Sequence, residues 1–533
     1  MSLPKSLLCV LLSAILLSLG IPNEFIQDGS AIFGIVSLVP LYIAMKHSKS
    51  WGIAGLLGGL MMSLVHIFSS FWLAFFKDFA VFTLGASALA YFGLGILVGW
   101  VLRYAFSLPR LTQPFIFALV WTLWEWFKSI GFVAYPWGTI IMTSRSFLPL
   151  IQIADITGTW GISFLFALIS ATFAEAFLIF YPVRNLGYKN ISVRWENFIP
   201  IALFTGFLVI LSSFYGFYRI LRPPEKQTDI RIVMVQQNAD SWDSNGRENA
   251  LLISQRLSRE ALAQSQEKTD LVIWSESVLT VPYETRKYYY DEFPRADPFA
   301  AFLEEIDTPL LVGSPVIVDH ENYGLSNSVL LIAPDGEQLD WYAKIQLVPF
   351  AEYMPFTEYK WVRDFFDTLV GFSRGWVPGK EFKAFSIQNV KGENILFTTP
   401  ICFEDAFSSL TAKLHNTGSN LLINLTNDSW SKTESAEYQH FAIAYFRAIE
   451  LRTTLIRSTN GGYSVVVDPL GIMLADMPLF TETSINIKIP VYPNITTFYA
   501  RFGDWFPVVL FIILIIITIG NQIHPSRSAG EKN

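Results

Sequence analysis

The sequence has few charged residues for its length. Of its 533 residues, 16% are Asp, Glu, Lys or Arg and 52% are hydrophobic, whereas soluble domains average about 25% charged residues. With 38 Lys and Arg against 45 Asp and Glu, the net charge is −7, so the chain lacks the basic field that attracts nucleic acid. We therefore expect much of the chain to lie in a membrane, with no nucleic acid partner.

Cysteine is almost absent, and its two occurrences, Cys9 and Cys402, lie far apart. Two cysteines support neither a disulfide framework nor a zinc cluster. The sequence also lacks GxGxxG, Walker and HExxH motifs, which typify nucleotide and zinc sites. We expect no metal and no cofactor. The six histidines are scattered and suggest no partner for Cys402, although a Cys–His dyad assembled in space stays open.

Long apolar stretches are the dominant feature of the sequence. A membrane-spanning helix needs about 20 mostly apolar residues. Eight such stretches lie at about residues 4–20, 31–46, 53–76, 80–102, 114–133, 160–181, 199–219 and 505–521. The sequence thus predicts a seven-helix membrane domain over 1–220, a water-soluble domain over 221–500, and a last spanning helix with a short cytoplasmic tail over 501–533.

Basic residues indicate the orientation of these helices. One side of the predicted membrane carries Lys5, Lys46, Lys49, Arg103, Arg110, Arg184, Lys189, Arg194, Arg527 and Lys532. The short loops and helix ends of the other side carry only Lys77, Lys128 and Arg145. Cytoplasmic loops are the ones rich in Lys and Arg, so the soluble domain is predicted to lie outside the cytoplasm.

The soluble domain shows alternating strand and helix patterns. Predicted strands are 230–237, 271–275, 310–316, 328–332, 395–401, 421–425, 465–467 and 485–489, and predicted helices are 249–266 and 436–451. Pro334-Asp335-Gly336 and Pro469-Leu470-Gly471 have turn composition. This pattern predicts layered α/β architecture without selecting one fold.

Three sites share one local form, a run of strand-forming residues that ends in a reactive side chain: Glu276 after Trp274-Ser275, Lys344 after Trp341-Tyr342-Ala343, and Cys402. A thiol is mostly protonated at neutral pH, and attacks only with help from a base or a nearby cation. Glu276 can be that base, and Lys344 can be that cation or stabilise an oxyanion. Each residue taken alone has an ordinary structural interpretation: a buried small thiol, a helix-capping carboxylate and a surface amine.

Four motifs that occur in order favour the catalytic interpretation over the structural one. They are Trp274-Ser275-Glu276, the stretch KIQLVPFAEYMP over 344–355, Cys402-Phe403-Glu404-Asp405, and Asn427-Asp428-Ser429-Trp430. Together they resemble the carbon–nitrogen hydrolase, or nitrilase, superfamily, whose members use a Glu–Lys–Cys triad on an α-β-β-α sandwich. With membrane helices before and after this domain, the chain resembles the apolipoprotein N-acyltransferase family of that superfamily.

This resemblance implies roles for individual residues. Glu276 matches the family's base, Lys344 its lysine and Cys402 its nucleophile. Glu352 and Glu404 match acidic residues that support the triad.

Two further positions follow from the resemblance. Phe403 stands where these acyltransferases usually have Tyr, so the ring is kept and the hydroxyl is lost, and Trp242 matches the tryptophan after the first strand. Ser431 stands where the family often has Phe. These departures concern substrate fit more than the chemistry.

The resemblance implies a function in lipoprotein maturation. Cys402 is expected to take an acyl chain from a phospholipid, typically phosphatidylethanolamine, as a thioester. The α-amino group of the diacylglyceryl-cysteine of an apolipoprotein then receives the chain. We expect a monomer in the bacterial inner membrane, with its soluble domain in the periplasm.

Two alternatives stay open at this point. One is a membrane-tethered amidase or nitrilase, in which water resolves the thioester. The other is a membrane scaffold or transporter that carries a degenerate domain. The eight apolar stretches favour the lipid-using transferase, because a hydrolase of soluble amides needs at most one anchor, and the intact residues Glu276, Lys344 and Cys402 disfavour a degenerate domain.

Overall fold

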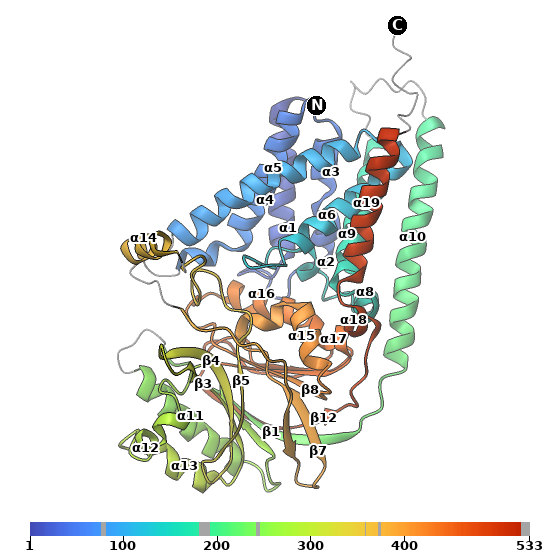
Figure 1. The fold of residues 1–533 in the computed structure, drawn as a ribbon. Coiled ribbons are helices and arrows are strands. Elements are labelled where there is room, and N and C mark those ends of the chain that lie inside the picture. The colour runs from blue at the N-terminus through green and yellow to red at the C-terminus, as the bar shows by residue number, and fades with distance from the viewer. Residues whose placement is uncertain (76–80, 181–191, 241–245, 358, 371–374, 524–533) are drawn as a thin grey trace. The chain divides into compact units, whose positions relative to one another are not determined.

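The computed structural model describes residues 1–75, 81–180, 192–240, 246–357, 359–370 and 375–523. The chain divides into two compact units (Figure 1). The helical unit comprises Met1–Leu221 and Phe502–Asn533, and the sandwich unit comprises Arg222–Arg501.

The helical unit consists mainly of apolar helices. Its described helices are α1 (Leu3–Gly20), α2 (Ala31–Ser37), α3 (Val39–Lys46), α4 (Trp51–Ser69), α5 (Ser87–Ala105), α6 (Gln113–Phe127), α7 (Leu148–Ile151), α8 (Ala154–Thr157), α9 (Thr159–Phe180), α10 (Ser192–Leu221) and α19 (Trp505–Ile523).

Within the described residues, five helices are long and apolar enough to cross a membrane: Leu3–Gly20, Trp51–Ser69, Thr83–Ala105, Thr159–Phe180 and Trp195–Leu221. The prediction of eight spanning helices is therefore supported for five of its stretches, and a count of about eight is not confirmed.

The three remaining stretches form shorter helices. Residues 31–46 are divided between α2 and α3, whose first turn contains Pro40; proline has no N–H to continue a preceding helix. The stretch 114–133 ends as helix at Phe127, before Gly131 takes a positive φ of 84°. At the C-terminal end, Trp505–Asn521 is a shorter apolar helix.

Helices α4 and α5 cross at very short distance, because glycines line their contact. A Cβ at Gly99 would lie 2.2 Å from the carbonyl oxygen of Ala54, and one at Gly58 would lie 2.3 Å from that of Gly95. Small residues at such crossings allow backbones to approach closely, which is how helices associate in lipid.

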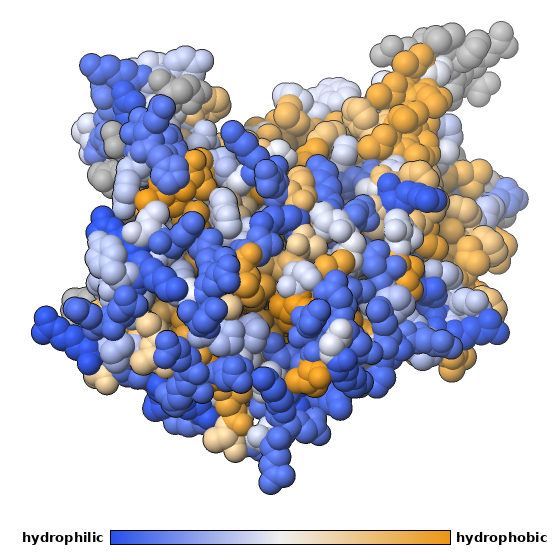
Figure 2. All heavy atoms as spheres, turned by 60° about the horizontal axis from the view of Figure 1, so that its bottom comes forward, coloured by the Kyte–Doolittle hydropathy of each residue, from blue (hydrophilic) through white to orange (hydrophobic). Residues whose placement is uncertain are grey.

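Large apolar side chains on α10 are exposed to the surroundings. Leu203, Ile210 and Phe214 are 69%, 69% and 72% exposed, and Figure 2 shows hydrophobic residues gathered on the side where α10 runs. Contiguous exposed apolar surface of this kind is unfavourable in water and suits contact with lipid.

The sandwich unit contains two six-stranded sheets. Its strands are β1 (Thr228–Gln236), β2 (Leu271–Ile273), β3 (Leu310–Asp319), β4 (Gly324–Ile332), β5 (Gln338–Ala343), β6 (Phe385–Gln388), β7 (Asn394–Thr398), β8 (Leu421–Thr426), β9 (Thr454–Thr459), β10 (Val465–Val467), β11 (Met473–Asp476) and β12 (Thr483–Val491). The strand orders are β12-β1-β2-β3-β4-β5 and β11-β10-β9-β8-β7-β6.

Helices cover the outer faces of the two sheets (Figure 1). Helices α11 (Gly246–Ala263), α12 (Lys287–Tyr290) and α13 (Phe299–Ile306) lie beside the first sheet, and α15 (Ser408–His415), α16 (Glu434–Ala444) and α17 (Phe446–Leu451) lie beside the second. Between the sheets, the hydroxyl of Ser458 on β9 lies 3.4 Å from the carbonyl oxygen of Ile273 on β2. The predicted α-β-β-α sandwich is confirmed.

All eight predicted strands occur, and both predicted turns connect antiparallel strands, β4 with β5 and β10 with β11. Strands β5, β6, β9 and β11 were not predicted. Their sequences, such as Gln338–Ala343 and Thr454–Thr459, mix polar and charged residues with apolar ones, so they give no clear alternating pattern. The predicted helix over 436–451 is two helices, α16 and α17, which divide at Tyr445.

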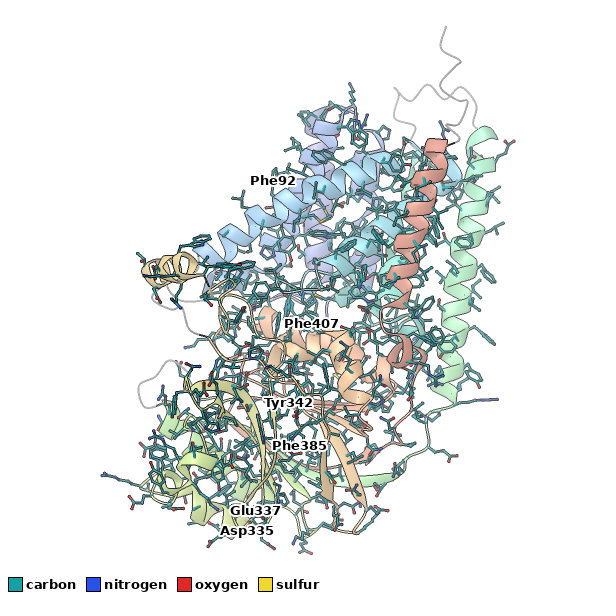
Figure 3. The ribbon with its side chains drawn as sticks, viewed as in Figure 1. Phe92, Asp335, Glu337, Tyr342, Phe385 and Phe407 are labelled. Carbon is teal, nitrogen blue, oxygen red and sulfur yellow. The ribbon has the colours of Figure 1, made fainter. Side chains whose placement is uncertain are left out.

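Aromatic side chains fix the strands that lead to the candidate site. Trp274, directly after β2, is fully buried and packs against Phe302 at 5.4 Å between ring centroids. Its indole N–H donates to the hydroxyl of Ser258 on α11 at 2.8 Å. In the second sheet, Phe385 (labelled in Figure 3) stacks on Phe397 of β7 at 5.4 Å. The backbone beyond β2 and β7 is therefore held by rigid packing.

Candidate active site

The three candidate residues follow the carboxyl ends of three strands. Glu276 follows β2, Lys344 follows β5, and Cys402 follows β7. The side chains of Glu276 and Lys344 approach within 3.5 Å. Cys402 Sγ lies 4.0 Å from Asp428 Oδ1, and the backbone N–H of the adjacent Asn427 donates to Glu276 Oε2. Three residues far apart in sequence thus meet in one place.

Lys344 is completely buried and lies between two carboxylates. Its ammonium donates to Glu352 Oε1 at 2.8 Å and lies 3.5 Å from Glu276 Oε1. Burial alone would lower the pKa of Lys344, but Glu352 and Glu276 raise this pKa well above its usual range. Lys344 is consequently a fixed positive charge rather than a proton donor.

Glu276 is also buried, and each of its oxygens accepts a hydrogen bond. Oε1 accepts from the side-chain amide of Asn327 at 2.7 Å, and Oε2 accepts from the backbone N–H of Asn427 at 2.9 Å. Burial raises the pKa of Glu276, although Lys344 opposes that shift. A buried carboxylate with a raised pKa is suited to accept and return a proton near neutral pH.

A glycine on the next strand permits this placement of Glu276. A Cβ at Gly313 of β3 would lie 2.2 Å from the backbone nitrogen of Ser277 and 2.7 Å from the Cα of Glu276. The chain beyond β2 therefore packs directly on the β3 backbone, which any larger residue at position 313 would prevent.

Cys402 occupies a strained turn between β7 and a short 3₁₀ helix, Cys402–Ala406. Its φ of 48° lies in the left-handed region, which costs a non-glycine residue about 1 kcal/mol or more. The side-chain amide of Asn424 donates to the carbonyl oxygens of Pro400 and Cys402, at 3.0 and 3.1 Å. Asn424 thereby holds the residue that presents the thiol.

The surroundings of Cys402 favour the neutral thiol. Burial, followed by the charge of Glu276, raises the pKa of this thiol well above its usual range, and Lys344 only partly offsets these two effects. A thiol in this form loses its proton to a base when it acts as a nucleophile. Glu276 is the neighbouring carboxylate whose pKa suits this transfer.

Glu352 and Glu404 brace the loops around Lys344 and Cys402. Besides Lys344, Glu352 accepts from the backbone N–H of Val348 at 2.9 Å. Glu404 accepts from the backbone N–H groups of Ile345 at 2.7 Å and of Ile401 at 2.8 Å, and burial raises its pKa to about 7. Glu404 thus connects the segment after Lys344 to the residue before Cys402.

The two other residues taken from the resemblance have different outcomes. The ring of Phe403 is buried and meets Phe407 edge to face at 4.8 Å, so this side chain contributes to packing beside the thiol. Trp242 lies outside the described residues.

Sequence reasoning missed several polar residues of the site. Asn327, on β4, also donates to Glu352 at 3.0 Å and so joins the two carboxylates that flank Lys344. Asp428 lies beside the thiol of Cys402, and His440 forms a hydrogen bond with Asp428. Asp428 belongs to the motif Asn427-Asp428-Ser429-Trp430, and this motif could have marked it as a site residue. Nothing in the sequence around Asn327 marks that residue as part of the site. Among the described residues, no group of three or more His, Cys, Asp or Glu could hold a metal ion.

Both parts of the chain are similar to known protein families. The family model for the apolipoprotein N-acyltransferase N-terminal domain matches residues 13–172, and the model for carbon-nitrogen hydrolase matches residues 231–491. A protein of Treponema denticola named apolipoprotein N-acyltransferase 2 is 49% identical over 96% of this chain and 96% of its own. The chain belongs to the apolipoprotein N-acyltransferase family.

A second relative is also similar over nearly the whole chain. Apolipoprotein N-acyltransferase 2 of Treponema pallidum is 43% identical, covering 97% of this chain and 95% of its own. A solved structure of Saccharomyces cerevisiae Nit3, a member of branch 10 of the nitrilase superfamily, is 19% identical with a TM-score of 0.35, covering 52% of this chain and 96% of its own. As an apolipoprotein N-acyltransferase, the chain is a membrane-associated acyltransferase of lipoprotein N-acylation.

Proposed function

We propose that this enzyme moves a fatty acyl chain from a phospholipid to the α-amino group of the S-diacylglyceryl-cysteine at the start of an apolipoprotein, through a thioester on Cys402. The observation that carries the proposal is the convergence of a partly exposed thiol, a buried carboxylate with a raised pKa and a fully buried ammonium. This set suits acyl transfer through a covalent intermediate.

In the first half of the reaction, the sulfur of Cys402 attacks the ester carbonyl of the phospholipid while Glu276 takes the thiol proton. The negative charge that develops on the carbonyl oxygen is stabilised by the Lys344 ammonium, whose position and charge are set before substrate binds. When the C–O bond breaks, Glu276 returns the proton to the leaving alkoxide, and a lysophospholipid departs.

In the second half, the amino group of the acceptor attacks the thioester carbon. Glu276, ionised again, removes a proton from nitrogen. It returns this proton to the sulfur of Cys402 as the C–S bond breaks, and an amide-linked acyl chain leaves with the acceptor. The ester donor and the amine acceptor are the only reactants that these bond changes require.

The setting of the reaction follows from substrate chemistry. Phosphatidylethanolamine is the proposed donor, and the proposed place is the bacterial inner membrane with the sandwich unit on the periplasmic side, as the last step of lipoprotein maturation. Exposed apolar residues on α10 support contact with lipid, and the bias of Lys and Arg supports the orientation. The monomeric state stays a prediction.

Mass spectrometry of the full-length protein tests this mechanism. Purified protein is incubated with phosphatidylethanolamine and then given a diacylglyceryl-cysteine peptide. We expect a hydroxylamine-labile acyl adduct on Cys402, which disappears as the peptide gains an amide-linked chain. Cys402→Ala should form no adduct, and Glu321→Gln, at an exposed position, should behave as wild type.

Two results would contradict the proposal. Loss of the adduct to water, with no acylated peptide, would favour an amidase-like hydrolase. Absence of any adduct with every donor tried would exclude Cys402 as the nucleophile.

A further inference from the structure

A second carboxylate, that of Asp428, faces the reactive sulfur. Asp428 lies two residues beyond β8, and its Oδ1 is 4.0 Å from Cys402 Sγ, within hydrogen-bonding range for a thiol. The hydroxyl of Thr426 lies 3.4 Å from the same Oδ1. The mechanism above uses Glu276 and gives Asp428 no role.

The two carboxylates reach the thiol from different sheets. Glu276 follows β2 of the first sheet and Asp428 follows β8 of the second. They are joined through one residue, because the backbone N–H of Asn427 donates to Glu276 Oε2. An acyl group on the sulfur therefore lies beside both Asp428 and Glu276.

Asp428 is held in its charged form by a buried network. His440 bonds to Asp428 Oδ2 at 2.7 Å through Nδ1 and to Asp405 Oδ1 at 2.9 Å through Nε2. Arg457 lies 3.7 Å from Asp428 Oδ2 and 3.4 Å from Asp405 Oδ2. Burial would lower the pKa of His440, but the charges of Asp428 and Asp405 outweigh the effect of burial and raise this pKa to about 9. The imidazole is consequently cationic at neutral pH.

The electrostatic environments of Asp428 and Glu276 are opposite. Burial would raise the pKa of Asp428, but His440 and Arg457 outweigh it, and the pKa is lowered. The pKa of Glu276 is raised. A carboxylate with a lowered pKa is a poor base and a strong acceptor of hydrogen bonds from cations. Only Glu276 is therefore suited to carry protons.

We propose that Asp428 is the binding group for the acceptor's amine: its Oδ1 accepts a hydrogen bond from the incoming α-ammonium and aims the nitrogen at the thioester carbon. The network orients Asp428 by occupying Oδ2, so that Oδ1 faces the sulfur. This role rests on the proposed function, because it requires an acyl group on Cys402.

The proton balance assigns separate tasks to the two carboxylates. The acceptor arrives as an ammonium bound to Asp428, and ionised Glu276 takes one proton, which frees the nitrogen lone pair. Glu276 releases this first proton to solvent. As the C–N bond forms and the C–S bond breaks, Glu276 transfers the second proton from nitrogen to the sulfur of Cys402. The third hydrogen stays on the amide, and Asp428 is never protonated.

Single-turnover measurements on full-length protein separate the two halves of the reaction. Asp428→Asn keeps the shape of the side chain and removes its charge. We expect adduct formation from phosphatidylethanolamine within about 3-fold of wild type. Discharge by a diacylglyceryl-cysteine peptide should slow by about 10- to 100-fold, the effect of losing a hydrogen bond to a charged group.

Two comparisons make the test specific. Hydroxylamine is neutral at pH 7 and needs no ammonium site, so it should discharge the adduct on Asp428→Asn at the wild-type rate. The exposed control Glu321→Gln should leave both halves of the reaction at the wild-type rate. If Asp428→Asn does not fold, Asp428→Glu keeps the charge and displaces it, and the same selective slowing of peptide discharge is expected.

Two outcomes would overturn the inference. Peptide discharge at the wild-type rate would show that the amine does not use Asp428. Equal slowing of both halves, or of hydroxylamine discharge, would reduce Asp428 to a structural group. Absence of an adduct in the wild type is a distinct result, which removes the thioester and this inference with it.

Discussion

Glu352 lies closer to the buried ammonium of Lys344, at 2.8 Å, than the candidate base Glu276 does, at 3.5 Å. The lysine is therefore held chiefly by a carboxylate that has no part in the proposed proton transfers. In the proposed mechanism, Glu276 can change its protonation without releasing Lys344, because the ion pair with Glu352 persists.

Replacement of Glu352 by glutamine tests whether Glu352 holds Lys344 while Glu276 transfers protons. We expect Glu352→Gln to lose about 1 to 3 kcal/mol of unfolding free energy, because a hydrogen bond to a charged group is weakened. Lys344 should then pair with Glu276 and weaken it as a base, slowing adduct formation at least about 10-fold. Thermal unfolding and single-turnover mass spectrometry measure both effects, with Glu321→Gln as the exposed control. Unchanged adduct formation would contradict the assignment.

The pH dependence of adduct formation reports on Glu276, which must be ionised to act. Its pKa is raised by burial, and the hydrogen bond from Asn327 lowers it. Asn327→Ala removes that donor, so the pKa of Glu276 should rise further and the acidic limb of the rate profile should move to higher pH. The exposed Asn322→Ala serves as control. A limb that stays in place, or moves to lower pH, would show that Asn327 does not tune the base.

The left-handed backbone of Cys402 predicts an unusual order of stability. Alanine is normally more stable than glycine by about 1 kcal/mol, but glycine adopts a φ of 48° without strain. We expect Cys402→Gly to unfold at the same temperature as Cys402→Ala or higher. The control is Ala406→Gly, four residues away in the same 3₁₀ helix, which should lower stability by about 1 kcal/mol. A Cys402→Ala variant that is more stable than Cys402→Gly would show that the backbone at position 402 is not strained.

Two glycines of α5 should respond oppositely to alanine. A Cβ at Gly99 would lie 2.2 Å from the Ala54 carbonyl oxygen, whereas a Cβ at Gly93 has nothing within 4 Å. Gly99→Ala should destabilise the protein by about 1 to 3 kcal/mol through overpacking. Gly93→Ala should stabilise it by up to about 1 kcal/mol through helix propensity. Thermal unfolding in detergent measures both, and equal effects would contradict close packing of α4 on α5.

The sequence by itself determined the features that depend on local pattern. Apolar stretches located the helices α1, α4, α9 and α10, and β-branched runs located all eight predicted strands, because hydrophobic periodicity reflects burial of a single element. Order and spacing of the motifs brought out Glu276, Lys344 and Cys402 through a family resemblance. Breaks within apolar stretches, as between α2 and α3, were missed because hydropathy alone does not register helix ends.

Only the tertiary structure decided which polar groups surround the three candidates. Asn327 bonds to Glu276 across 51 positions of sequence, and Cys402 and Asp428 come from different strands of the second sheet. Such contacts depend on strand order and register, and no residue carries a local signal of the neighbour it will meet. The directions of the pKa shifts follow from the same contacts, because burial and neighbouring charges, rather than residue type, give Glu276 and Asp428 opposite shifts.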